Sequence, residues 1–283
     1  MRVKYLFFLF LGLIFFLNEN LLQAAQIDMY SMEEIVNIRL VGKIEKGDAE
    51  KFERLVEDLR QKKRTVNMLM LASIGGDANE AMRIGKIVRE SFIPTHAPFA
   101  LDAGFTCNEY PSGLEDEDCD CASACFLIWV AGVYRMGNVL GIHQPYFLEE
   151  YFEGLSASEA DKEYVLMHER VISYLKNMDV PEHIIDIMFN TGSDEMTYLD
   201  WDTAKSMESV PFFDEQIGAS CLGLTAEEEM DYWGFLAKKW EEKSTLTKSE
   251  KSYFNHLKER KRNFDNCFKE KLKEAQLKEK NTS

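Results

Sequence analysis

The chain has 283 residues, of which 46% are hydrophobic and 12% aromatic, and its formal net charge is −16. This length and composition are sufficient for one sizeable core with an appendage. The negative charge argues against nucleic acids and anionic membrane surfaces as partners, because both are bound by basic faces.

Residues 1–25 have the three-part pattern of a secretory signal. A basic start, MRVK, precedes an apolar stretch of about thirteen residues, and the segment ends in small residues. The apolar stretch is shorter than the roughly 20 residues that a membrane-spanning helix needs. We therefore expect a cleaved signal and a periplasmic or secreted protein; the alternative, an uncleaved membrane anchor, is disfavoured by this length.

Strand and helix patterns alternate from residue 36 onward. The segment 36–44 is rich in β-branched residues and predicts a strand, and 47–63 carries apolar residues at helical spacing. The nearly continuous apolar run 66–73 is typical of a central parallel strand buried on both faces. A second amphipathic helix is expected over 78–90.

The alternation continues beyond this helix. Strands are expected within 93–104 and at 139–147, and helices over 156–178 and 181–192. This pattern predicts an α/β fold around a mostly parallel sheet.

The composition changes near residue 213, where β-branched residues become rare and mixed charge becomes dense. Such a sequence predicts helices that end in a solvated charged tail. We therefore expect three parts: the signal 1–25, an α/β domain 26–212, and a helical C-terminal extension 213–283.

The six cysteines indicate disulfides, because their number is even and the expected compartment is oxidising. Other pairings stay open, since four clustered cysteines allow three connectivities. No metal is expected, because no histidine stands at metal-ligand spacing beside the cluster. A bond between Cys121 and Cys125 requires that the turn between these two cysteines is not regular helix. The expected pairs are Cys107 with Cys119, Cys121 with Cys125, and Cys221 with Cys267.

The segment SIGGD, residues 73–77, places two glycines between a buried strand and a helix. Glycines allow a sharp turn with outward-pointing amides. The segment is either a tight turn or an anion hole in which the amide of Gly76 binds developing negative charge.

Ser123 stands at the head of an apolar helical run, between Ala122 and Ala124. Its ordinary role would be a helix N-cap. The small neighbours leave room for a ligand, however, and the Ala124 amide would be free to donate. A serine hydroxyl becomes a nucleophile only when a base takes its proton.

His143 is the histidine best placed to be that base. It stands at the edge of a buried strand, one connection after Ser123. Sites in parallel sheets form where such strand ends gather. The alternative is a histidine packed in the core.

Three ordered segments, SIGGDANEAMRIGKIVRE, CASACFLIWVAGVYR and GIHQPYF, together resemble the Clp protease proteolytic subunit and its crotonase-fold relatives, in particular a secreted, periplasmic bacterial branch. The resemblance covers about residues 36–210. It implies a ββα superhelix around a mostly parallel sheet. It also implies that Ser123 is the nucleophile, His143 the base, and Gly76 and Ala124 the donors of oxyanion amides.

The sequence departs from this family at two points. Ile74 stands where the family has proline. The segment that should carry the acidic partner offers three candidates: Asn190, Asp194 and Glu195. We take Asp194 as the expected third residue, with a loop-capping role as its alternative. A Ser-Lys site is less well supported, because Lys162 is the nearest lysine to the matching position.

The sequence thus predicts a secreted serine hydrolase, a peptidase acting on peptide or protein substrates without a cofactor. No ATPase partner is expected, because ATP is scarce outside the cytoplasm, and a homo-oligomer stays open. The alternative is a Clp-like envelope scaffold or adaptor of weak or lost activity, with the C-terminal extension as its contact surface. An acyl-CoA enzyme is disfavoured, because coenzyme A is cytoplasmic and the chain has no basic patch for its phosphates.

Overall fold

The computed structural model describes residues 25–32, 35–101, 104–106, 119–146, 153–210, 220–240 and 246–278. The expected signal lies outside these residues except for Ala25, and Cys107 lies outside them as well. Among the described helices, none combines the length and the apolar character needed to cross a membrane.

The central layer is a sheet with the strand order β1-β2-β3-β4-β8. β1 pairs antiparallel with β2 at one edge, and the remaining pairs are parallel. Leu69, Met70 and Leu71 of β3 are consecutive and all buried, so this part of the strand is covered on both faces, as expected for a central strand. The strands are β1 (Gln26–Met32), β2 (Ile35–Val41), β3 (Thr65–Ala72), β4 (Thr95–His96) and β8 (Arg135–Met136).

A smaller sheet, in the order β10-β9-β7, continues from the end of β3. A parallel bridge between Ser73 and Cys121 joins the two sheets. β7 and β9 are parallel, and β10 is antiparallel to β9. The strand expected within 93–104 is divided between β4 and the hairpin of β5 and β6. The strands are β5 (Phe99–Leu101), β6 (Gly104–Thr106), β7 (Cys121–Ala122), β9 (Leu140–Ile142) and β10 (Thr197–Tyr198).

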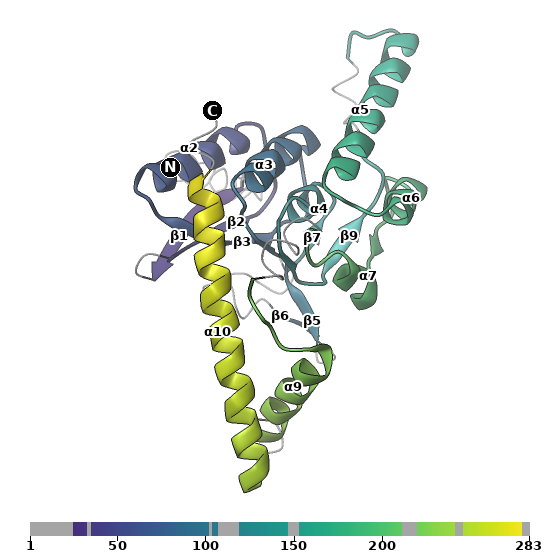
Figure 1. Cartoon of the computed structure of the whole chain (residues 1–283). Coiled ribbons are helices and arrows are strands. Elements are labelled where there is room, and N and C mark those ends of the chain that lie inside the picture. Colours follow the sequence, from purple (N-terminus) through teal and green to yellow (C-terminus); the bar gives the residue numbers. More distant parts are fainter. Residues whose placement is uncertain are drawn as a thin grey trace, which may run out of the picture.

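Helices pack beside these strands, most of them at the positions that the sequence predicted; the short helix at Trp201–Ser206 was not expected. α2, α3 and α4 contact one another in succession, and α5 extends away from the body (Figure 1). Side-chain caps stabilise the first turns of two of them. Asp77 accepts hydrogen bonds from backbone amides at the start of α3, and Ser156 forms a capping box with Glu159 at the start of α5. The helices are α2 (Asp48–Gln61), α3 (Ala78–Glu90), α4 (Ala124–Trp129), α5 (Ala157–Asn177), α6 (Glu182–Asn190) and α7 (Trp201–Ser206).

In the described part of the C-terminal extension, helix α9 (Ala226–Trp240) and the long helix α10 (Lys248–Lys278) meet as a hairpin at one end of the molecule (Figure 1). The far end of α10 docks on the main sheet. There the side-chain amide of Gln276 donates to the carbonyl oxygens of Val66 (2.9 Å) and Phe92 (3.1 Å), and its oxygen accepts from the Val66 amide (3.1 Å). Gln276 thus substitutes for a strand partner at the start of β3.

Candidate active site

Ser123 occupies a sharp turn between β7 and α4. Its backbone angles are φ 56° and ψ −120°, a conformation that L residues rarely adopt and that costs about 1–3 kcal/mol. A strand–turn–helix elbow of this kind raises a serine hydroxyl out of its surroundings. The hydroxyl makes no capping bond to the amides of α4, so Ser123 holds the N-cap position without acting as a cap.

The glycine pair lies directly against this elbow. A Cβ atom on Gly75 would stand 2.6 Å from the Cβ of Ser123 and 3.0 Å from the nitrogen of Ala124, which is too close for any side chain. A Cβ on Gly76 would stand 2.1 Å from the carbonyl oxygen of Ile44. Both glycines also have positive φ, at 106° and 137°. Glycine is therefore required twice, and the SIGGD turn is packed against the start of α4.

The backbone amides of Gly76 and Ala124 have no acceptor among the residues that the structure describes. Ile44 donates to the Gly75 carbonyl at 2.8 Å and accepts from the Asp77 amide at 2.9 Å. In a parallel bridge this pattern turns the amide of the intervening residue, Gly76, away from Ile44. Within the described part of the chain, neither the Gly76 amide nor the Ala124 amide has an acceptor. Unpaired amides of this kind are the donors that an oxyanion hole requires.

His143 follows β9 with only 7% of its surface exposed. Its Nδ1 lies 2.8 Å from the carbonyl oxygen of Gln144. Because a carbonyl can only accept, this contact places the proton on Nδ1 and leaves Nε2 with a free lone pair. The backbone around the ring is held as well, since the Gln144 amide donates to Thr191 (3.0 Å) and His168 Nε2 lies 3.2 Å from the Pro145 carbonyl oxygen.

His96 is an example of a histidine packed in the core, which is the alternative considered for His143. It lies in β4 with 3% of its surface exposed, and burial lowers its pKa to about 4. It packs edge-on against Phe99 and does not line the cleft described next. His96 is therefore a neutral core histidine.

One cleft of about 880 Å³ is lined by all five residues that the sequence assigned to catalysis and to the oxyanion hole. Its inner wall is apolar and its rim carries charges of both signs. Between Ser123 Oγ and His143 the structure shows no hydrogen bond. The apolar wall is formed by the buried side chains of Leu127, Met167, Val171 and Met188, and the charged rim by Lys43, Glu45, Lys46, Asp77, Asp194 and Glu195.

The expected acidic partner is not bonded to the imidazole. Asp194 is exposed in the turn between α6 and β10, and within the described residues it makes no hydrogen bond. Glu195 also lines the rim, whereas Asn190 and Lys162 do not line the cleft. The group that contacts His143 Nδ1 is the Gln144 carbonyl. Sequence reasoning missed it, because a backbone oxygen has no signature in residue type.

Disulfides join Cys121 to Cys125 and Cys221 to Cys267. Cys119 is disulfide-bonded too, but Cys107, its expected partner, lies outside the described residues. The Cys121–Cys125 bond is possible because the turn at Ser123 is not regular helix. Within the described ranges, no group of three or more His, Cys, Asp or Glu side chains could hold a metal ion.

No family model and no curated protein matches the chain. Among solved structures, it is similar to ClpP1 from Listeria monocytogenes, with 16% identity, a TM-score of 0.42, and coverage of 61% of this chain and 86% of that one. For an asparagine-to-aspartate mutant of that ClpP1 the identity is 17% and the TM-score 0.42, with coverage of 62% of this chain and 93% of that one.

A serine-to-alanine mutant of the membrane-bound stomatin-specific protease 1510-N gives 17% identity, a TM-score of 0.38, and coverage of 62% of this chain and 75% of that one. Likenesses at this level carry no argument about activity. The described part of the chain forms an α/β structure in which the Ser123 hydroxyl, the His143 imidazole and the amides of Gly76 and Ala124, which have no acceptor among the described residues, line one cleft.

Proposed function

We propose that the protein is a serine hydrolase that cleaves peptide bonds by acyl transfer, with Ser123 as nucleophile and His143 as general base. The observation that carries this proposal is the shared cleft: a serine on a strained elbow, a histidine with a free Nε2, and two amides without acceptors. The three sequence segments that resemble the Clp protease subunit support the same assignment.

In the proposed reaction, His143 Nε2 takes the proton of Ser123 as its oxygen attacks the substrate carbonyl. The carbonyl oxygen becomes negatively charged, and the amides of Gly76 and Ala124 donate hydrogen bonds to it. The imidazolium then gives its proton to the leaving amine, and an acyl-enzyme remains. Water, activated by the same imidazole, releases the acid and restores the hydroxyl. The missing Ser123–His143 hydrogen bond is compatible with this sequence, because such bonds are often long before substrate binds.

The Gln144 carbonyl performs the orienting role in this proposal. It holds the imidazole in the tautomer that leaves Nε2 free, which is the main task of the third residue in a triad. A neutral carbonyl stabilises the imidazolium less than a carboxylate does. We therefore expect slower turnover than in a site completed by an acid, and we assign Asp194 no bond to the ring.

The cleft favours an extended peptide with an apolar side chain beside the cleaved bond. Its inner wall is formed by Leu, Met and Val side chains, while charges stay at the rim. Burying an aliphatic side chain against such a wall contributes about 1.5–3 kcal/mol. We also place the protein outside the cytoplasm, because disulfides are typical of oxidising compartments.

A fluorophosphonate probe tests this function. The wild type is expected to be labelled once, and Ser123→Ala is expected to lose the label together with peptide hydrolysis. Ser193→Ala is the matched control, since Ser193 lines the same cleft but is not part of the proposed Ser123–His143 pair, and labelling of this variant should be retained. A folded wild type that takes no label would overturn the proposal.

A scaffold function is the second candidate, and the surface of the C-terminal extension favours it. Leu222 is 85% exposed and Met230 on α9 is 70% exposed. If these side chains mediate assembly with other copies, Met230→Lys should lower the mass measured by light scattering. An unlabelled wild type that assembles through this surface would favour the scaffold over the hydrolase.

A further inference from the structure

We propose that the Cys121–Cys125 disulfide is the positioning element of Ser123. The bond holds the elbow in its strained conformation and keeps the hydroxyl and the Ala124 amide available for catalysis. This inference rests on the proposed hydrolase function, and it assigns to this disulfide a role beyond general stability.

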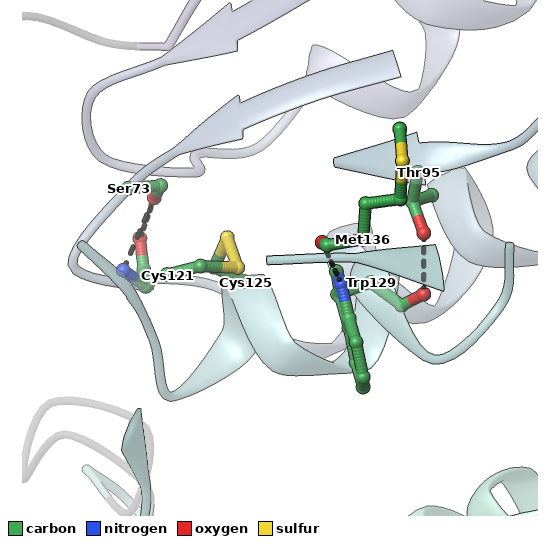
Figure 2. Close-up of a disulfide and its surroundings, with 7 residues drawn as sticks. Ser73, Thr95, Cys121, Cys125, Trp129 and Met136 are labelled. Atoms are coloured by element: carbon green, nitrogen blue, oxygen red, sulfur yellow. Dashed lines mark hydrogen bonds between the residues drawn. A yellow bond between two sulfur atoms is a disulfide. The ribbon is translucent and has the colours of Figure 1, made fainter. Parts of the chain in front are cut away.

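The bond encloses Ser123 in a short covalent ring. Cys121 lies on β7 and Cys125 is the second residue of α4, with their Cα atoms 5.2 Å apart (Figure 2). Both cysteines are fully buried. The ring therefore ties the last strand residues before the elbow to the first turn of the helix after it.

The strand side of the elbow is already fixed by hydrogen bonds. The amide of Ala122 donates to Ser73 (3.0 Å), and the amide of Ser123 donates to Gly141 (2.8 Å). The C-terminal end of α4 is fixed too: the Trp129 indole donates to the Met136 carbonyl at 2.8 Å, and Thr95 Oγ1 donates to the Trp129 carbonyl at 2.8 Å (Figure 2).

The N-terminal end of α4 lacks a side-chain cap. An uncapped first turn frays readily, because its first amides lack acceptors; in α4 the Phe126 amide does donate to the Ser123 carbonyl, at 3.1 Å. A serine side-chain cap would turn the Ser123 hydroxyl back toward the amide of Cys125 or Phe126, and the hydroxyl would then no longer face the cleft as a nucleophile. A disulfide fixes the turn without using the serine side chain, and it therefore reconciles a fixed helix start with a free Ser123 hydroxyl.

Loosening the elbow would also disturb the glycine pair. Gly75 is so close to Ser123 that a Cβ on it would lie 2.6 Å from the serine Cβ, so movement of either residue displaces the other. The relative positions of the nucleophile and the Gly76 amide thus depend on the same short segment. Removing the disulfide should slow the chemical step more than it weakens substrate binding.

The test compares two double variants of the full chain, each leaving no unpaired thiol. In Cys121→Ala/Cys125→Ala we expect the rate constant of fluorophosphonate labelling and kcat to fall at least tenfold, with KM changed less than twofold. In the matched control, Cys221→Ala/Cys267→Ala, a disulfide remote from the cleft is removed, and both rates should stay within twofold of the wild type. Rates are compared on protein that thermal unfolding shows to be folded.

The proposal is overturned if the folded Cys121→Ala/Cys125→Ala protein keeps the wild-type kcat and labelling rate. Should this variant not fold, Cys121→Val/Cys125→Ala refills part of the buried space and is judged by the same criterion. Hydrogen exchange of the segment 121–129 separates this proposal from the hydrolase function, because exchange does not require activity. We expect at least tenfold faster exchange there without the bond, and unchanged exchange would refute the positioning role even in an inactive protein.

Discussion

The two disulfides whose cysteines are both described serve two different regions of the molecule. Cys121–Cys125 spans a separation of 4 residues beside the cleft, and Cys221–Cys267 spans 46 residues and ties the C-terminal extension together. By loop-closure entropy the short bond contributes about 2 kcal/mol to stability and the long bond about 4 kcal/mol. The bond that should matter more for folding is thus remote from the proposed chemistry, and the bond that should matter more for activity adds less stability.

The largest expected effect is on unfolding. Cys221→Ala/Cys267→Ala should lower the free energy of unfolding by about 4 kcal/mol, and Cys121→Ala/Cys125→Ala by about 2 kcal/mol, because the longer loop restricts the unfolded chain more. Urea denaturation with and without each bond measures the difference. If removing Cys121–Cys125 lowered the free energy of unfolding more than removing Cys221–Cys267, the short disulfide would be the more important one for stability, contrary to this comparison.

A glycine substitution near the elbow should reduce activity strongly. We expect Gly75→Ala to slow labelling about 100-fold, equivalent to about 2.7 kcal/mol, because its Cβ would collide with Ser123. Gly47→Ala is the control: Gly47 also has a positive φ, 98°, but a Cβ there meets nothing within 4 Å. Similar labelling rates in the two variants would show that the elbow is not tightly packed against the glycine pair.

In the C-terminal extension, Gln276→Ala should destabilise the docking of α10 on the sheet. Its side chain makes three half-buried hydrogen bonds to the backbone of Val66 and Phe92, and their loss should cost about 1–3 kcal/mol. Hydrogen exchange of α10 and urea denaturation measure the effect, with the exposed Gln61→Ala as control. Labelling of Ser123 should stay within twofold, and a large loss would couple the extension to the cleft.

The smallest expected effect is at Asp194. Since the Gln144 carbonyl occupies His143 Nδ1, Asp194→Asn should change kcat less than twofold, whereas His143→Ala should abolish hydrolysis. Steady-state kinetics of the two variants measure this contrast. A loss of 100-fold or more in Asp194→Asn would restore the carboxylate to the orienting role expected from the sequence.

Much of this architecture follows from sequence patterns. The apolar run of β3 and the amphipathic helices α2, α3 and α5 lie close to their expected ranges, because periodic burial fixes both the type and the extent of an element. The edge strand β1 was not expected, since its pairing with β2 depends on the backbone of a neighbour rather than on an apolar pattern of its own.

Sequence patterns selected residues that line one cleft, but they did not predict the backbone details of that cleft. Ser123, His143 and the glycine pair were found from their small neighbours and their places after strands, and they line one cleft. The Gln144 carbonyl and the positive φ of Ser123 could not be found in this way, because both are properties of the backbone. The position of Asp194 depends on a turn whose path no local pattern specifies.

The account's central claim is that Ser123 is an activated nucleophile, and mapping of the fluorophosphonate adduct by tandem mass spectrometry tests it most directly. The account predicts one adduct per folded chain, on Ser123, which disappears in His143→Ala. A folded wild type without an adduct, or with an adduct on another residue, would contradict it.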